Sequence, residues 1–317
     1  MARLGWRRRG GHEPDGPQEP DPVYGYLTAA QGARLRSLVR QSFAERGVEV
    51  TLLPDRVETA GGGQYGLTNL AATCNASPAR EWPSIVAWHV ETVLRALSAP
   101  PVSELDDATV LAHVFVRVMG LSAVPDLSAL DYRRELGGDL VELLALDSEH
   151  SVSLLLDGHV ERFGVDTLRH AGLVNLLAEP FGSCDQVEVG DGGSFHCLLG
   201  DSVYTASRLL TLDDVLRRCT GEADAPHGVL ACVPNRHQLA FHVLTDATVL
   251  TVLPAMARFA LAGFTDGVGP VSPYLYWHRR GTLTQLSRTD SGGDLRIEVG
   301  DEFAEVLQRL AGKRPRE

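Results

Sequence analysis

Residues 228–244 read GVLACVPNRHQLAFHVL and form the most strongly patterned part of the sequence. Two apolar runs, 228–233 and 238–244, flank the polar turn Pro234-Asn235-Arg236. Short apolar runs bounded by turn residues are typical of buried strands. A Pro-Asn pair suits the centre of a type I or II turn, whereas tight hairpins prefer primed turns. We therefore predict two core strands that are joined by a loop longer than two residues.

Helical patterns surround this pair of strands. One helix follows a capping-box sequence at 28–31 and ends at Gly47, and a second amphipathic helix ends at Pro100. Further helical segments are predicted at 106–111, 166–177, 203–210, 211–219, 255–264 and 303–310. Strands are predicted at 48–53, 56–60, 113–119, 140–146, 152–157, 274–278, 283–286 and 295–299. Because strands occur in runs with helices inserted between them, we predict an α+β fold with a mixed, mainly antiparallel sheet.

The two ends of the chain differ in composition from the rest. Residues 1–25 carry an arginine cluster followed by Gly, Pro and acidic residues, where a signal peptide would need an apolar segment. We therefore predict a disordered N-terminal tail at 1–25 and a basic C-terminal tail at 313–317. No repeat or linker interrupts 26–312, which we interpret as a single α+β domain.

The charge of the chain restricts its partners. With 29 Lys+Arg against 41 Asp+Glu, the formal net charge is −12, which disfavours nucleic acid and anionic membranes and favours basic partners. The only lysine is Lys313, so Schiff-base, pyridoxal-phosphate and P-loop lysine chemistry is excluded from the core. Pro254 and Arg258 interrupt the most apolar stretch, 247–264, and no membrane span is predicted.

The cysteines and histidines give no metal pattern. The five cysteines are Cys74, Cys184, Cys197, Cys219 and Cys232. An odd, scattered set without a Cys-x-x-Cys pair indicates reduced thiols in a cytoplasmic protein. His237 and His242 lie five residues apart, so a strand places them on opposite faces. We predict no metal and no cofactor, and a metal site assembled from distant residues stays the alternative.

Four ordered segments within residues 30–287 form a set. They are Gly66-Leu67-Thr68-Asn69-Leu70; Phe163-Gly164-Val165 with Ala171 and Asn175-Leu176; Tyr204-Thr205-Ala206-Ser207-Arg208-Leu209-Leu210; and Val233-Pro234-Asn235-Arg236 with Leu239. In this order they resemble the uncharacterised YtpQ-like family of bacterial proteins. The chain departs from that pattern at His237, where an acidic residue is expected. The resemblance implies an α+β fold in a bacterial cytoplasm and implies no particular activity.

Three features that suggest catalysis or cofactor binding are weak candidates. Gly61-x-Gly63-x-x-Gly66 matches the dinucleotide-binding string, but the strand before it is short and alternating, so we interpret it as a strand-connecting turn. Ser207 lacks a nucleophile elbow and suits helix packing. Asp185 would raise the pKa of the neighbouring Cys184 thiol, which opposes a nucleophilic role. No catalytic residue is therefore assigned.

The arginines supply the candidate ligand-binding site. Arg208 on its helix is expected to converge with Arg236, and Asn235 and His237 lie beside Arg236 in the turn. Fixed guanidinium donors suit a carboxylate or phosphate. In the alternative, these are buried arginines already satisfied by carboxylates and backbone carbonyls. If no carboxylate neutralises the two arginines, the ligand-binding interpretation is favoured over the structural one.

Three hypotheses for function follow. The first is a cytoplasmic, non-enzymatic binding or regulatory protein that recognises its ligand at 234–237, with an acidic partner of a basic protein as a variant. The second is an enzyme that binds an anionic metabolite or phosphoester through Arg208 and Arg236. The third is a structural subunit, which would expose a large apolar patch.

Overall fold

The computed structural model describes residues 19–59, 63–98, 100–124, 126–148, 151–290, 292 and 294–312. The chain divides into two compact units, Met1–Val90 and Glu91–Glu317, where the sequence predicted one domain. The boundary between the units falls inside the continuous helix α3 (Trp82–Ser98). Because no loop or linker separates the units, the amino-acid composition does not change at the boundary. The predicted C-terminal tail and residues 1–18 of the predicted N-terminal tail lie outside the described residues.

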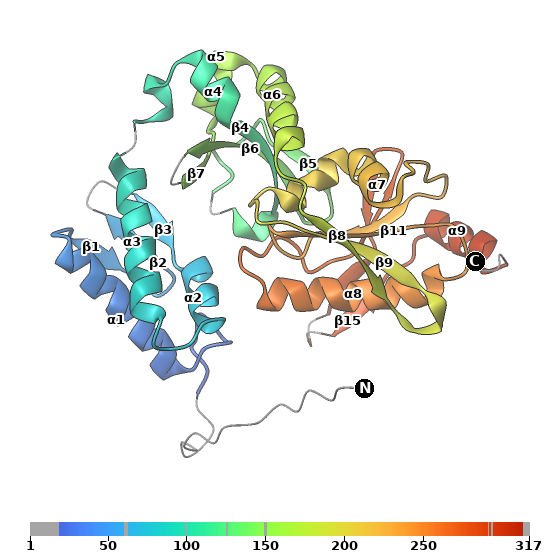
Figure 1. Ribbon diagram of the computed structural model, residues 1–317, viewed down its shortest axis with the longest axis horizontal. Helices are drawn as coiled ribbons and strands as arrows, with labels where there is room; N and C mark the ends of the chain where they lie inside the picture. The colour runs from blue at the N-terminus through green and yellow to red at the C-terminus, as the bar shows by residue number, and fades with distance from the viewer. Residues whose placement is uncertain are drawn as a thin grey trace. The chain divides into compact units, whose positions relative to one another are not determined.

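The first unit combines helices with a three-stranded antiparallel sheet (Figure 1). Its elements are α1 (Ala29–Glu45), β1 (Val50–Leu52), β2 (Arg56–Thr59), β3 (Gln64–Gly66), α2 (Thr68–Asn75) and the first part of α3. The predicted capping box is confirmed, because Thr28 and Gln31 exchange hydrogen bonds of 3.2 and 2.8 Å. β2 and β3 are antiparallel neighbours, as expected for a strand-connecting turn rather than a dinucleotide-binding unit.

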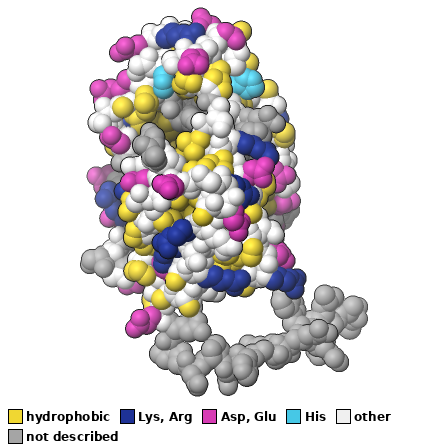
Figure 2. Space-filling model, turned by 90° about the vertical axis from the view of Figure 1, so that its left-hand side faces the viewer, with side chains coloured by type: hydrophobic (Ala, Val, Ile, Leu, Met, Phe, Trp, Pro, Cys, Tyr) yellow, Lys and Arg dark blue, Asp and Glu magenta, His cyan; other side chains and the backbone are white. Residues whose placement is uncertain are grey.

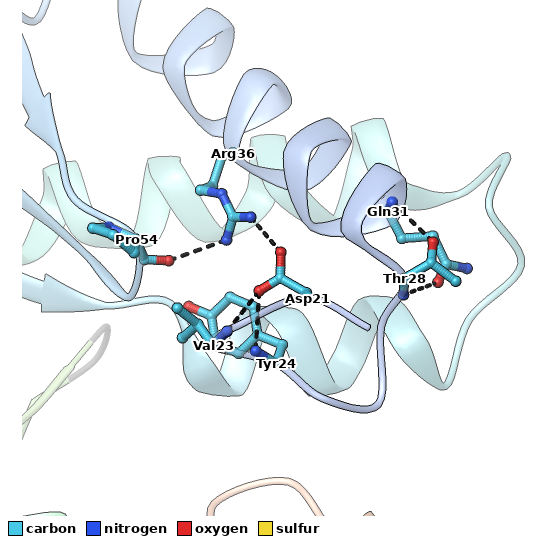
Figure 3. A network of polar contacts seen from close by, with 7 residues as sticks. All are labelled: Asp21, Val23, Tyr24, Thr28, Gln31, Arg36 and Pro54. Carbon is cyan, nitrogen blue, oxygen red and sulfur yellow. Dashed lines mark hydrogen bonds and ion pairs between the residues drawn. The ribbon is translucent and has the colours of Figure 1, made fainter. Parts of the chain in front are cut away.

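Order begins before residue 26. The buried carboxylate of Asp21 pairs with Arg36 on α1, and Arg36 also donates to the Pro54 carbonyl at 3.2 Å (Figure 3). Asp21 Oδ1 accepts hydrogen bonds from the backbone N–H groups of Val23 and Tyr24, both at 3.0 Å. The pairing of Asp21 with Arg36 orders residues 19–25. The Pro and Gly content of this segment predicted disorder, because local composition does not reveal a contact with a distant residue.

Replacing Asp21 with Asn is expected to lower the free energy of unfolding by about 3 kcal/mol at neutral pH, because the Arg36 charge loses its buried partner. The Arg36 guanidinium holds the pKa of Asp21 below its usual value. A carboxyl whose pKa is depressed in the folded state stabilises above its unfolded pKa of about 3.9, and the stabilisation is lost as the pH falls through the folded value. Hydrogen exchange of α1 amides at neutral and acidic pH measures both effects.

Asp55→Asn is the matched control, because the Asp55–Arg56 pair is exposed and contributes about 0–1 kcal/mol. If the α1 amides of the Asp21 variant are as protected from hydrogen exchange as those of the wild type at neutral pH, the Asp21–Arg36 pair has no stabilising role.

The second unit contains two larger antiparallel sheets and a small hairpin (Figure 1). The six-stranded sheet has the order β13 (Thr282–Gln285), β12 (Tyr276–Arg279), β10 (Val229–Cys232), β11 (Gln238–Val243), β9 (Ser194–Leu199) and β8 (Ser183–Glu188). The four-stranded sheet contains β4 (Val114–Gly120), β6 (Leu140–Ser148) and β5 (Arg134–Gly137) in that order, with β7 (Ser151–Leu154) paired to β6. The hairpin is β14 (Ser287–Thr289) with β15 (Leu295–Ile297). The predicted α+β fold with mainly antiparallel pairing is thus confirmed.

Helices lie between these strand runs. They are α4 (Asp107–His113), α5 (Asp157–Phe163), α6 (Val165–Ala178), α7 (Leu212–Thr220), α8 (Val249–Asp266) and α9 (Asp301–Ala311). The short 3-10 helices are η1 (Val102–Glu104), η2 (Leu121–Ala123), η3 (Gly190–Gly192) and η4 (Thr205–Thr211). The segment predicted as a helix at 203–210 is therefore a tighter 3-10 helix. It has about three residues per turn, so its side chains point in different directions from those of an α-helix.

The quoted stretch forms the central hairpin. β10 and β11 pair antiparallel with Cys232 opposite Ala240, and the loop between them has five residues, longer than two as predicted. Alternate β10 side chains point into two cores, one with Leu230 beside α8 and the other with Ala231 beside η4 and α7. A strand that is buried on both faces has a continuous apolar sequence, which explains why the apolar run 228–233 could be recognised as a strand from the sequence.

Helix α8 covers one face of the six-stranded sheet. It begins at Val249, six residues before the predicted start, and Pro254 lies inside it. By length and composition it is the one described helix apolar enough to cross a membrane. Val252 and Met256 on this helix pack in the core with the strands.

Candidate functional site

Asn235 shapes the turn between β10 and β11. Its side-chain nitrogen donates to Gln238 Oε1 at 2.9 Å and to the Gly263 carbonyl at 3.1 Å, and its Oδ1 accepts from the His237 N–H at 3.1 Å. The residue is 4% exposed. All of its polar atoms are thus engaged within the protein, and Asn235 acts by fixing the turn rather than by contacting a ligand.

The backbone and the aliphatic part of the Arg236 side chain are both held in place by neighbouring residues. Its N–H donates to the Gly269 carbonyl at 2.9 Å, and its carbonyl accepts from Ala206 of η4 at 3.1 Å. Gly269 has φ +71°, and a Cβ there would lie 2.6 Å from Arg236 Cδ, so glycine leaves room for the arginine stem. The Arg236 Nε donates to His237 Nε2 at 2.9 Å. Among the described residues, none accepts a hydrogen bond from its two Nη atoms.

His237 orients Arg236. Its Nδ1 lies 3.2 Å from the Gly200 carbonyl, which only accepts hydrogen bonds, so Nδ1 carries the proton and Nε2 is free to accept from Arg236. Burial, and then the Arg236 charge, lower the pKa of His237. The ring also lines a pocket of about 510 Å³ together with Gly182, Ser183, Leu199, Gly200, Asp201 and Gln238. His237 is therefore a neutral positioning residue at neutral pH.

The second arginine of the site is Arg117 of β4, which sequence reasoning missed. Ala206 of η4 holds Arg236, and the next residue, Ser207, accepts a hydrogen bond from the backbone N–H of Val118 at 3.0 Å. Two consecutive residues of η4 therefore connect β4, the strand that carries Arg117, to the turn that carries Arg236. Burial, and then the nearby Arg117 charge, lower the pKa of Arg236.

Neither arginine forms an ion pair among the described residues, although the Asp147 charge acts on Arg117 from further away and raises its pKa. In the part of the chain that the structure describes, neither Arg117 nor Arg236 lies within 4.0 Å of an acidic oxygen, although fourteen other arginine–carboxylate pairs form there. Burial also lowers the pKa of Arg117. Two partly buried like charges repel each other in a medium of low dielectric constant. Their neighbourhood therefore favours a bound anion.

Tyr204 contributes a third polar group. Its ring stacks on Phe115 of β4 with centroids 4.2 Å apart, and only 1% of the residue is exposed. Its hydroxyl is buried and has no hydrogen-bond partner among the described residues. The Tyr204 hydroxyl lies near the Arg117 charge, and burial raises its pKa. An unpaired buried hydroxyl is costly, and an anion beside Arg117 would accept a hydrogen bond from it.

Arg208 has a different environment from the one predicted. Its Nη2 donates to the carbonyls of Glu179 and Pro180 at 2.8 and 3.4 Å, and the guanidinium lies 5.0 Å above the Phe181 ring. The charges near it are those of Arg218, Asp214 and Glu179, and Arg236 is not among them. The residue is 1% exposed, and its Nη1 is buried without a hydrogen-bond partner among the described residues. Arg208 is thus held in part by backbone carbonyls, as in the structural alternative, and Arg117 is the arginine near Arg236.

The cysteines correct one expectation. Cys184 of β8 and Cys219 of α7 form a disulfide, with Cα atoms 5.8 Å apart, where the sequence indicated reduced thiols. The pairing depends on how β8 packs beside α7, which their separation of 35 residues does not reveal. Cys74, Cys197 and Cys232 are buried free thiols. No three His, Cys, Asp or Glu side chains of the described residues are placed to share a metal ion.

Comparisons with known proteins add no identity. No protein-family model, curated protein or solved structure matches the chain. The resemblance to the YtpQ-like family stays a prediction, and the function is inferred from the site.

Proposed function

We propose that the protein is a non-enzymatic binding protein that recognises a small oxyanion, a carboxylate or a phosphate, between Arg117 and Arg236. The observation that carries the proposal is that η4 holds both β4, which bears Arg117, and the turn of Arg236, while neither arginine forms an ion pair among the described residues. The buried Tyr204 hydroxyl supplies a further unused donor beside Arg117. Planar guanidinium donors match the geometry of carboxylates and phosphates.

Binding without catalysis follows from the groups around the pair. The Ser207 hydroxyl accepts a backbone hydrogen bond and is buried, which makes it a poor nucleophile. Both ring nitrogens of His237 are engaged, one with Gly200 and one with Arg236, so the ring positions Arg236 rather than moving a proton. The alternative from the sequence, an enzyme acting on an anionic metabolite, would need one of these groups to be free.

Calorimetric titration with sodium sulfate at constant ionic strength tests the proposal, because sulfate stays a dianion throughout the neutral range. We expect one saturable site. Arg258→Gln is the matched control, since Arg258 is exposed on α8, and it is expected to bind sulfate like the wild type. A titration that shows only the heat of dilution would rule out the oxyanion site.

A second candidate function is association with a basic partner. Residues 1–90 carry ten arginines and nine carboxylates, so residues 91–317 carry a formal net charge of −13. Arginine and carboxylate side chains are interspersed on the face in Figure 2, which shows no continuous field of one sign among its described residues. If the unit 91–317 supplies an acidic surface, binding to polylysine should weaken steeply as ionic strength rises.

We also propose a cytoplasmic setting, supported by the three buried free thiols. In that compartment disulfides are usually transient, so the Cys184–Cys219 bond is expected to be reduced in growing cells and formed under oxidative stress. Alkylation of intact cells followed by mass spectrometry distinguishes the two forms.

A further inference from the structure

A second polar pocket lies where β9 begins and β11 ends, apart from the arginine pair. Its volume is about 390 Å³, within the range of small-molecule sites. The lining residues are Gly192, Ser194, His196, Thr220, Glu222, Asp224, Pro226, His227, His242, Val243, Leu244, Thr245, Asp246 and Thr248. None of them belongs to the oxyanion site, so the pocket is a separate feature of the second unit.

His242 is one of the lining residues and carries an unused acceptor. Its Nδ1 lies 2.8 Å from the Ser194 carbonyl, which accepts hydrogen bonds only, so Nδ1 carries the proton. Burial lowers the pKa of His242, which keeps the ring neutral at neutral pH and leaves a lone pair on Nε2. The residue is 8% exposed, and Nε2 is buried without a hydrogen-bond partner in the described residues. A ligand with an N–H or O–H donor would satisfy this atom.

The charge of the lining selects a cation. Glu222, Asp224 and Asp246 contribute carboxylates, and the lining contains no lysine or arginine. Glu222 and Asp224 form no ion pair within the described ranges, so their charges are available. Asp246 is buried and accepts hydrogen bonds from Thr245 and Thr248. The pocket therefore combines negative charge with an acceptor that requires a donor.

The arrangement fits an organic cation better than a metal ion. A divalent ion needs several ligands at about 2.0–2.6 Å from one point. The described residues offer no group of three His, Cys, Asp or Glu side chains that is placed in this way. An ammonium on a carbon skeleton carries both the positive charge and N–H donors, and it fills a pocket of this size.

We propose that this pocket binds a primary ammonium ligand, which donates an N–H to His242 Nε2 and places its charge near Glu222 and Asp224. The ligand class is an aliphatic amine or diamine. The site is independent of the oxyanion site, so the failure of either proposal leaves the other standing.

Titration of the full chain with 1,4-diaminobutane tests the proposal, with the ¹⁵N shift of His242 Nε2 and calorimetry as readouts. We expect saturable binding and a shift of Nε2 toward the value of a hydrogen-bonded acceptor. Tetramethylammonium carries the charge but has no N–H donor, and we expect it to bind at least fivefold more weakly without shifting Nε2.

The double variant Glu222→Gln with Asp224→Asn changes exposed side chains and is expected to weaken diamine binding at least tenfold without loss of folding. Glu135→Gln, an exposed carboxylate outside the pocket, is the control and should leave affinity unchanged. Equal affinity for the diamine and tetramethylammonium, or saturable Zn²⁺ binding with no response to the diamine, would overturn the proposal.

Discussion

Replacing Gly172 with alanine is expected to destabilise the second unit by about 2 kcal/mol, although the same change inside a helix normally stabilises by about 1 kcal/mol. Gly172 lies at the centre of α6, where the helix contacts β4 directly. A Cβ at this position would lie 2.7 Å from the Val116 nitrogen and 2.9 Å from the Phe115 carbonyl carbon. These are backbone atoms of a paired strand, so they yield only if α6 or β4 moves.

The displacement also has a functional consequence. β4 carries Arg117, so a shift of the strand moves one half of the arginine pair. Urea unfolding and sulfate titration of the Gly172→Ala variant should therefore both show a loss.

Gly158→Ala provides the control for this prediction. Gly158 also lies in a helix, α5, but no atom lies within 4 Å of its added Cβ. That variant should be as stable as the wild type or more stable, because alanine costs less conformational entropy than glycine. If Gly172→Ala is also stabilising, α6 does not pack against β4 as closely as described.

The variants Arg117→Gln and Arg236→Gln are each expected to weaken sulfate binding by at least tenfold. Hydrogen bonds to charged groups contribute about 1.5–3 kcal/mol, which corresponds to about tenfold to a hundredfold in affinity. The double variant should show no saturable binding. Tyr204→Phe keeps the stacking on Phe115 and removes only the hydroxyl, so a smaller loss is expected.

The stability of the same variants separates a binding role from a structural one. Without ligand, Arg117 and Arg236 repel each other, so replacing either should leave the free energy of unfolding unchanged or raise it. Arg208→Gln should instead destabilise, because Arg208 is buried and donates to two backbone carbonyls. Loss of folding in the Arg236 variant would make Arg236 a structural residue.

Sequence patterns predicted the parts of the fold that local chemistry determines. The β10–β11 hairpin was found because both strands are buried on two faces and read as continuous apolar runs. β8 was missed because it is an edge strand whose side chains are mostly exposed and polar, so it has no apolar signal. The N-terminal order around Asp21 and the disulfide depend on contacts between distant segments, which no local pattern encodes.

The candidate site was predicted in part. The turn at 234–237 was correctly singled out as a polar interruption between two apolar strands. From the sequence, Arg236 of this turn was paired with Arg208, because both arginines belong to the segments that resemble the YtpQ-like family. Arg117 carries a visible signal, since it is the one charged residue in the apolar strand 114–120. The sequence does not show which groups surround this arginine, and only the packing of η4 shows that its strand lies beside the turn of Arg236.

The most direct measurement is the position of a bound oxyanion. Selenate has the shape and charge of sulfate, and its selenium is located by anomalous diffraction from crystals grown without sulfate or phosphate. We expect an anomalous peak within hydrogen-bond distance of the guanidinium groups of both Arg117 and Arg236. A well-ordered structure with no peak there, or with carboxylates closed onto both arginines, would contradict it.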